Sequence, residues 1–221
     1  MSFKLRKFVT NLHKRTKRDV LARMVNKKVF CMKVAKQYGK EYWDGNRKFG
    51  YGGYKYIEDR WKSVARKLIK NYNLKNSSKI LDIGCGKGYL LFEIKKILPN
   101  IEIVGFDISS YAIKNSKKEI KKFLFTKDIR TKLNFNNKYF DLTISLGVFH
   151  NLELFEIEKS LKELNRVSKK SYIMVESYRN DQELFNLQCW ALTCKSFFSP
   201  EDWKYIFKKN LYKGDFEFIY F

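Results

Sequence analysis

Proline and histidine are scarce in this chain of 221 residues, which contains two of each. Pro99 and Pro200 do not lie in a linker-like stretch, so nothing divides the chain into two large domains. No apolar run approaches the roughly 20 residues that span a bilayer, and residues 1–36 lack the apolar core of a secretory signal. With 44% hydrophobic residues, we expect one cytoplasmic domain with a small appendage.

Cysteine is also sparse, and its spacing excludes two kinds of site. The four cysteines form no Cys-x-x-Cys pair, and only His13 and His150 are available to join them in a metal site. A zinc site and a disulfide framework are therefore not expected. We predict free thiols and no bound metal.

Acidic residues are outnumbered two to one, 23 against 46 basic residues, which gives a formal net charge of +23. Such a charge is typical of proteins with a polyanionic partner, whether nucleic acid, an anionic membrane or a phosphorylated substrate. The alternative is the coding bias of an AT-rich genome, since Lys, Asn, Ile, Phe and Tyr are all abundant. Lysine far outnumbers arginine, the residue that phosphate recognition favours, so composition favours coding bias.

The first 60 residues differ from the rest. Residues 1–36 hold twelve basic residues against one acidic residue, Asp19, and their apolar spacing predicts one or two short basic helices. Residues 42–54 are rich in aromatic residues and glycine, which predicts a loop. We place a domain boundary here, with basic helices and the loop in residues 1–60 and the main domain in residues 61–221.

From residue 79 the pattern alternates between short apolar strands and helices, which predicts a Rossmann-like α/β fold with helices on both faces of a mostly parallel sheet. Helices are expected at 59–72, 89–97, 111–121 and 153–167, and another begins at the Ser199-Pro200 cap. We expect seven strands, the last of them antiparallel at the sheet edge. They are Lys79–Ile83, Glu102–Phe106, Phe123–Phe125, Phe140–Leu146, Ser171–Ser177, Leu187–Thr193 and Phe216–Phe221.

The first strand runs directly into the sequence Gly84-Cys85-Gly86-Lys87-Gly88 and then into a helix. Glycines allow close backbone approach to a ligand, and ligands of open α/β sheets sit at the carboxyl ends of the strands. Asp82 precedes the loop, and its carboxylate repels a pyrophosphate. It suits a ligand that presents an ammonium group or a water molecule.

Two further acidic residues follow the next strands. Asp107 ends the second strand, where its carboxylate can accept hydrogen bonds from both ribose hydroxyls of an adenosine. Asp128 and Ile129 follow the third strand, within reach of an adenine edge.

These features resemble the class I S-adenosylmethionine (SAM) dependent methyltransferase family over roughly residues 77–221. Asp82, Gly84, Gly86 and Gly88 match its first motif, and Asp107 matches its ribose acid. The resemblance implies that Gly84–Gly88, including Cys85, holds the amino-acid end of SAM. It also implies that Ile108 packs on adenine, that Leu146 lines the sulfonium, and that the product is S-adenosylhomocysteine (SAH).

Two other interpretations compete with this one. A nucleotide-dependent dehydrogenase needs glycine at the third position of G-x-G-x-x-G, and Tyr89 stands there. A structural glycine turn in a noncatalytic fold is the other. The combination of Asp82 before the glycines and Asp107 after the next strand favours SAM.

The acceptor is harder to infer. His150, just past the fourth strand, and Glu176, at the end of the fifth, are candidates for a general base. Each has a structural alternative, a backbone hydrogen bond for His150 and a salt bridge to Arg179 for Glu176. The chain lacks the Asn/Asp-Pro-Pro-aromatic and Pro-Cys motifs that two routes of base methylation use.

The aromatic segment, residues 42–54, is a candidate lid over the cofactor. We place Tyr51 with the cofactor and Tyr54 in catalysis, the alternative being an aromatic cluster that packs the basic helices onto the sheet. The segment is similar to one in bacterial methyltransferases of surface polysaccharide or specialised metabolism. That resemblance implies a sugar or other small-molecule acceptor. An RNA methyltransferase that grips phosphates with its basic helices, and a noncatalytic SAM-binding protein, are the alternatives. The sequence leaves the oligomeric state open.

Overall fold

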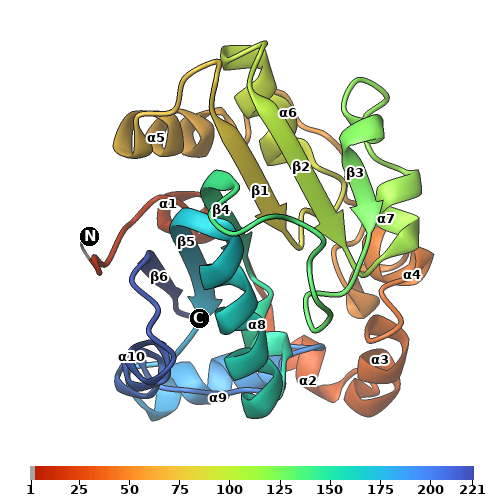
Figure 1. Cartoon of the computed structure of the whole chain (residues 1–221). Coiled ribbons are helices and arrows are strands. Elements are labelled where there is room, and N and C mark those ends of the chain that lie inside the picture. The colour runs from red at the N-terminus through yellow and green to blue at the C-terminus, as the bar shows by residue number, and fades with distance from the viewer. Residues whose placement is uncertain (1–2) are drawn as a thin grey trace.

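Six parallel strands form the central sheet of the computed structural model, which describes residues 3–221 (Figure 1). Their order is β3-β2-β1-β4-β5-β6, and all five pairings are parallel. The order reverses between β1 and β4, which creates a switch point where ligands bind in such sheets. The strands are β1 (Lys79–Ile83), β2 (Glu102–Asp107), β3 (Leu124–Thr126), β4 (Phe140–Leu146), β5 (Ser168–Glu176) and β6 (Asp215–Ile219).

Helices cover both faces of this sheet, as the alternating pattern predicts. Side chains of α5, α6 and α7 pack on one face, and those of α8 and α10 pack on the other. No helix within residues 3–221 is long and apolar enough to cross a membrane. These helices are α5 (Lys62–Tyr72), α6 (Tyr89–Ile97), α7 (Ser110–Lys114), α8 (Leu154–Val167) and α10 (Pro200–Lys209).

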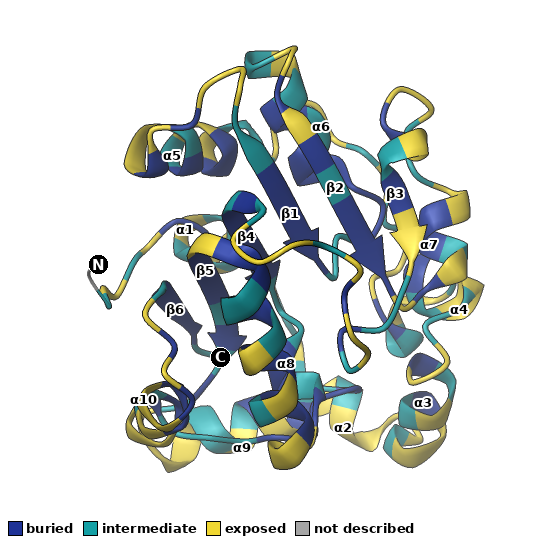
Figure 2. Cartoon of the chain, viewed as in Figure 1, coloured by how far each residue is buried: buried dark blue, intermediate teal, exposed yellow. Residues whose placement is uncertain are grey.

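A second group of helices lies beyond the carboxyl ends of the strands, and its outer surface is largely exposed (Figure 2). In Figure 1, α2, α3 and α4 lie on the same side of the sheet as α9, and α2 contacts α9. The group comprises α2 (Val20–Val25), α3 (Lys28–Ala35), α4 (Lys40–Trp43) and α9 (Asp181–Trp190), whereas α1 (Thr10–Lys14) packs beside the sheet against β6. Single 3-10 turns occur at η1 (Arg47–Phe49), η2 (Lys121–Phe123) and η3 (Phe149–Asn151).

The strand predicted at Leu187–Thr193 is wrong, because most of it belongs to α9 and the loop that follows. The Asn180 side chain caps α9 by accepting from the Glu183 amide at 2.9 Å, and acidic residues in the first turn suit the helix dipole. Leu187 and Cys189 are buried at alternate positions, as in a strand. The cap and the acidic first turn nevertheless favour a helix, and the segment folds as one. The sheet therefore has six strands instead of seven.

The last strand is also parallel, where an antiparallel one was expected. The connection from β5 to β6 passes through α9 and α10, and such a crossover returns the chain in the same direction. The free edge of β6 is occupied by the N-terminal segment, since the Arg6 amide donates to Phe216 O at 2.8 Å and Phe216 N donates to Lys4 O at 3.0 Å.

The helix predicted at 111–121 ends early, at Lys114. Two polar side chains bond to the helix's own carbonyl groups, Asn115 Nδ2 to Tyr111 O at 2.8 Å and Ser116 Oγ to Ile113 O at 2.8 Å. Such bonds compete with continued helix hydrogen bonding. The remaining residues, rich in lysine, then lack a buried face that would hold a helix.

A buried carboxylate fixes the N-terminal segment to the sheet. Glu217 in β6 is 1% exposed and accepts hydrogen bonds from the amides of Phe8, Val9 and Thr10 at 2.5, 3.0 and 2.6 Å. The Tyr172 hydroxyl donates to the same carboxylate at 2.5 Å. Glu217 thus satisfies amides at the start of α1 and ties residues 8–10 to β5 and β6.

Replacing this carboxylate should destabilise the fold. We expect Glu217→Ala to lower the free energy of unfolding by about 3 kcal/mol, because buried amides and a buried hydroxyl lose a charged acceptor. Urea denaturation measures the change. Glu201→Ala, which removes an exposed carboxylate near Lys204, is the control and should change stability by less than about 0.5 kcal/mol. Equal effects of the two substitutions would contradict this assignment.

Candidate functional site

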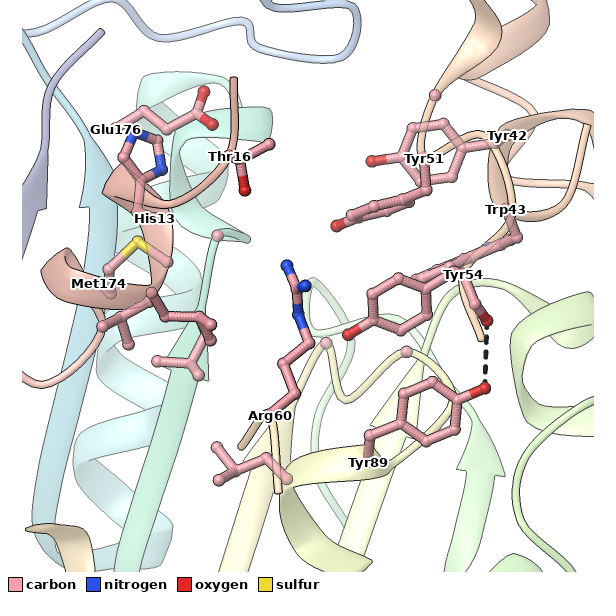
Figure 3. Close-up of a pocket in the computed structure, with 18 of the residues that line it drawn as sticks. His13, Thr16, Tyr42, Trp43, Tyr51, Tyr54, Arg60, Tyr89, Met174 and Glu176 are labelled. Atoms are coloured by element: carbon pink, nitrogen blue, oxygen red, sulfur yellow. Dashed lines mark hydrogen bonds between the residues drawn. The ribbon is translucent and has the colours of Figure 1, made fainter. Parts of the chain in front are cut away.

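A cavity of about 600 Å³, here the central cavity, lies between the glycine loop and the aromatic segment (Figure 3). It opens at the carboxyl ends of β1, β4 and β5, where the order of the strands predicts a ligand. Most of the predicted site residues line it. They are Tyr51, Tyr54, Asp82, Gly84, Cys85, Gly86, Leu146, His150 and Glu176.

The glycine loop, residues 84–88, allows an indole ring to lie directly on its backbone. A Cβ at Gly86 would come within 2.9 Å of the Trp43 ring, and Gly86 has a φ of +56°. Gly88 differs from the prediction, since it lines neither this cavity nor its neighbour. A Cβ at Gly88 would meet Ile120 and Leu124 at 2.7 Å. Because glycine lacks that atom, the start of α6 can pack against β3.

Asp82 is a buried carboxylate that faces the central cavity without a hydrogen-bond donor among the described residues. Burial, reinforced by the nearby Asp107 carboxylate, raises the pKa of Asp82 to about 8. A buried acid without a partner is costly when charged. A ligand ammonium group placed against it would restore the charged form, which fits the amino-acid end of SAM.

A second cavity of about 340 Å³, here the strand-end cavity, adjoins the first and shares Trp43, Tyr51 and Gly84 with it. Asp107 lies on its wall and accepts hydrogen bonds from Gly86 N at 2.9 Å and Ser109 N at 2.8 Å. Burial raises the pKa of Asp107, and these two amides oppose the shift. Its carboxylate keeps acceptor capacity for the hydroxyls of a ribose.

The other predicted adenosine contacts also line the strand-end cavity. Ile108 is 46% exposed and Ile129 is buried, and together with Phe106 they give the cavity the apolar surface that an adenine ring needs. The Asp128 carboxylate is ion-paired with Arg130, whose Nε lies 2.8 Å from Oδ2. The sequence places Asp128 within reach of the adenine edge, but in the structure its carboxylate is bound to Arg130.

Aromatic rings from residues 42–54 form one wall shared by both cavities. Trp43 and Tyr51 stack with their centroids 5.1 Å apart, and Tyr54 stacks on Tyr89 of α6 at 5.2 Å. The Trp43 indole N–H donates to Ser109 Oγ at 2.8 Å. Burial raises the pKa of the Tyr54 phenol well above its ordinary value, so that hydroxyl stays protonated at neutral pH and can donate a hydrogen bond.

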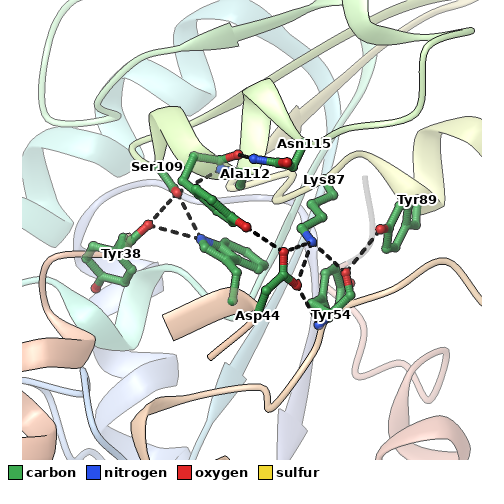
Figure 4. Close-up of polar contacts among 10 residues, drawn as sticks. Tyr38, Asp44, Tyr54, Lys87, Tyr89, Ser109, Ala112 and Asn115 are labelled. Atoms are coloured by element: carbon green, nitrogen blue, oxygen red, sulfur yellow. Dashed lines mark hydrogen bonds and ion pairs between the residues drawn. The ribbon is translucent and has the colours of Figure 1, made fainter. Parts of the chain in front are cut away.

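An ion pair connects this aromatic wall to the glycine loop (Figure 4). The buried Lys87 Nζ lies 2.7 Å from both carboxylate oxygens of Asp44 and 2.8 Å from Tyr54 O. Tyr111 OH donates to the same carboxylate at 2.9 Å. Partial burial acts to raise the pKa of Asp44. The hydrogen bonds from Lys87 and Tyr111 outweigh this effect and hold that pKa below its usual value. Sequence reasoning missed Lys87, although its place among the glycines was a signal.

His150 and Glu176 lie together at the far side of the central cavity. His150 Nδ1 accepts from the Glu176 amide at 3.1 Å, so the ring proton is on Nε2, which lies 3.5 Å from Glu176 Oε2. Burial lowers the pKa of His150, although the Glu176 charge opposes this. The neutral imidazole has no free lone pair for an acceptor proton. Glu176 is the partner of His150 and forms no ion pair with Arg179, which binds Glu183.

The sequence matches a family model described as a methyltransferase domain over residues 74–211. A second model, described as Protein-L-isoaspartate(D-aspartate) O-methyltransferase, matches residues 5–135. Both matches contain the glycine loop and Asp107. The chain belongs to the SAM-dependent methyltransferases, and SAM is its cofactor.

Individual relatives agree with this family. The chain is 33% identical over 141 residues to the uncharacterised protein MJ1252 of Methanocaldococcus jannaschii. This match covers 64% of this chain and 51% of that protein. It is 25% identical to a demethylmenaquinone methyltransferase of Thermotoga maritima, over 77% of this chain and 69% of that one. The match thus spans about half of the first relative's length.

Solved structures show the same fold. A SAM dependent methyltransferase from Archaeoglobus fulgidus superposes with a TM-score of 0.52 and 26% identity, covering 68% of each chain. The class I methyltransferase assignment, the parallel α/β sheet and the SAM cofactor are therefore confirmed.

Proton release tests the assignment of Asp82. Near pH 6.5, below its pKa of about 8, the free protein holds Asp82 protonated, while the α-amino group of SAH is charged. Binding that places this ammonium against Asp82 should expel about one proton. Calorimetry of SAH binding in buffers of different ionisation enthalpy measures it. Asp82→Asn should abolish the release, and wild-type binding without any proton release would refute the assignment.

Proposed function

We propose that this protein transfers the methyl group of SAM to a small-molecule acceptor bound in the central cavity. One observation carries the proposal: Asp82, which suits the amino-acid end of SAM, and the His150–Glu176 pair line the same cavity of about 600 Å³. A volume of this size is typical of small-molecule sites. The match to a demethylmenaquinone methyltransferase, named for a small molecule, is consistent with it.

Glu176 is the proposed general base. SAM supplies an activated methyl group on its sulfonium, so the protein chiefly has to orient the acceptor and, for a hydroxyl, remove its proton. Glu176 is only partly buried and its carboxylate can accept that proton. The buried His150 holds the Glu176 backbone amide and faces its carboxylate, and so serves as a positioning residue. Tyr54, protonated, donates a hydrogen bond to the acceptor.

The aromatic segment serves as a lid in this proposal. Trp43, Tyr51 and Tyr54 line the central cavity, and Lys87 holds them onto the glycine loop. A wall of stacked rings excludes water from the reacting atoms. The segment thus combines the two roles that the sequence left as alternatives, since it also packs the N-terminal helices against the domain through Trp43 and Ser109.

An RNA acceptor is the second candidate, because exposed basic residues surround the N-terminal helices. Lys14, Lys17, Lys33 and Lys36 are all exposed and are free to meet phosphates. Deleting residues 1–36 would also remove the segment bound to β6, so it is a poor test. Replacing Lys14, Lys17 and Lys33 with glutamine should preserve the fold, because all three side chains are exposed. A loss of salt-sensitive RNA binding in that variant would favour RNA.

Substitution of the base tests the proposal. With labelled SAM and a whole extract of the source cells, separated by ultrafiltration only after the reaction, we expect label in a small molecule and not in RNA or protein. Glu176→Gln should lower the rate of transfer about 100-fold or more, because proton removal is lost, and leave SAH affinity unchanged. Glu119→Gln, an exposed site, is the control. Label transferred only to RNA or protein would contradict the small-molecule proposal, and an undiminished rate in Glu176→Gln would contradict the base.

A further inference from the structure

Arginine is concentrated at the central cavity far beyond its share of the chain. The sequence contains ten arginines, and five of them line this one cavity. They come from separate elements along residues 15–60, so only the fold brings them together. Figure 3 shows the Arg60 side chain extending into the cavity, between Tyr51 and Tyr54 on one side and His13 and Glu176 on the other. The five are Arg15, Arg18, Arg23, Arg47 and Arg60.

These five arginines differ from most of the others in having no carboxylate partner among the described residues. Within residues 3–221, none of the five forms an ion pair, whereas four of the remaining five do, namely Arg6, Arg130, Arg166 and Arg179. Asp82 and Glu176 are the acidic residues that line the cavity, and the ammonium group of SAM offsets the first. The cavity therefore carries an excess of positive charge that the protein does not neutralise.

Neutral groups hold three of the guanidinium groups in place. The centres of Arg18, Arg23 and Arg47 lie 5.5, 3.8 and 5.2 Å from the ring centroid of Trp190. Arg18 NH1 donates to Thr16 O at 2.9 Å, Arg23 NH2 to Gly50 O at 3.1 Å and Arg47 NH1 to Tyr51 O at 2.7 Å. An aromatic face and carbonyl oxygens fix the direction of a guanidinium without removing its net charge.

The clustered charges repel one another. Burial, together with the neighbouring Arg47 and Arg18, lowers the pKa of Arg23 to about 10. Burial also lowers the pKa of Arg18, where Arg47 acts in the same direction and Glu176 opposes it. Among the described residues the Arg60 side chain has no hydrogen-bond or ion-pair partner, although its backbone amide donates to Ile57 O, so its five side-chain N–H donors are available. A bound anion would relieve the repulsion and use these donors.

We propose that the acceptor is a phosphorylated small molecule whose phosphate binds among Arg18, Arg47 and Arg60. This inference rests on the proposed function, which it deepens by naming the class of substrate. A guanidinium group can donate two parallel hydrogen bonds to the oxygens of one phosphate. Several guanidinium groups around one cavity match a ligand group with two or more negative charges. The arginines gather around one cavity and do not follow an extended groove, which favours a small phosphorylated molecule over RNA backbone.

The arrangement also orients the substrate. Glu176 lies near Arg18, since its charge affects the Arg18 guanidinium, and both residues line the central cavity. With the phosphate held at the arginines, the reacting hydroxyl lies beside Glu176, which is near Arg18. Binding at the phosphate thus fixes the orientation of the part of the acceptor that is methylated.

Pyrophosphate is a suitable probe, titrated by calorimetry into the protein already loaded with SAH. We expect binding to wild type, and an affinity about ten-fold lower in Arg60→Gln because charge-assisted hydrogen bonds are lost. Arg66→Gln is the matched control, since Arg66 is also exposed and does not line the cavity. Arg18→Gln should weaken binding as well, and SAH affinity should stay the same in Arg60→Gln.

Different failures have different meanings in this experiment. Absence of SAH binding would contradict the methyl-transfer proposal itself. Normal SAH binding without pyrophosphate binding, or equal losses in Arg60→Gln and Arg66→Gln, would overturn the phosphate assignment alone. Citrate serves as a carboxylate probe, and citrate binding as tight as that of pyrophosphate would also overturn it. Tighter binding of a short uridine oligonucleotide that depends on Arg60 would overturn it in favour of RNA.

Discussion

The contact between Lys87 and Asp44 is the interaction on which the site depends. Lys87 belongs to the glycine loop and Asp44 to the aromatic segment, and the ammonium lies 2.7 Å from both carboxylate oxygens. Lys87 is 4% exposed, so the ion pair is largely removed from water and its loss would leave a buried charge. Because the same ammonium also holds Tyr54 O, one side chain fixes both ends of the aromatic wall.

This contact holds the aromatic segment against the glycine loop, so that both segments line one cavity. A glycine loop at the end of β1 is by itself an open ledge for a cofactor. The aromatic segment adds a wall of stacked rings to it, and the helices that precede the segment bring Arg18 and Arg23 to the same cavity. The anchoring of residues 8–10 by Glu217 fixes the other end of these helices. The N-terminal extension is therefore part of the site.

Much of the fold follows from the sequence because apolar periodicity is a local signal. The bounds of β1 and β4 agree with the prediction, and so does the cap at Ser199. Leu187–Thr193 was misjudged because its alternation fits a strand and a helix equally well, and the deciding cap at Asn180 lies outside that window. The parallel direction of β6 depends on the path of the connection, which periodicity does not report.

The cofactor side of the site was predictable for a similar reason. Asp82, the glycines and Asp107 lie close together in the sequence, at the ends of adjacent strands, and the structure brings them together as expected. The arginine cluster was not predictable, because its members are separated in sequence. The excess of lysine over arginine in the whole chain pointed to coding bias, but composition does not report where the few arginines gather.

The dependence of SAH binding on Lys87 tests this account most directly. Lys87→Met keeps the length of the side chain and removes the charge, so the aromatic wall should detach from the glycine loop. We predict that SAH affinity, measured by calorimetry, falls about ten-fold or more, and that amide hydrogen exchange of residues 42–54 speeds up. The control Lys95→Met changes a lysine that contacts Ile101 O and should leave both unchanged. Unaltered SAH affinity and exchange in Lys87→Met would contradict the account.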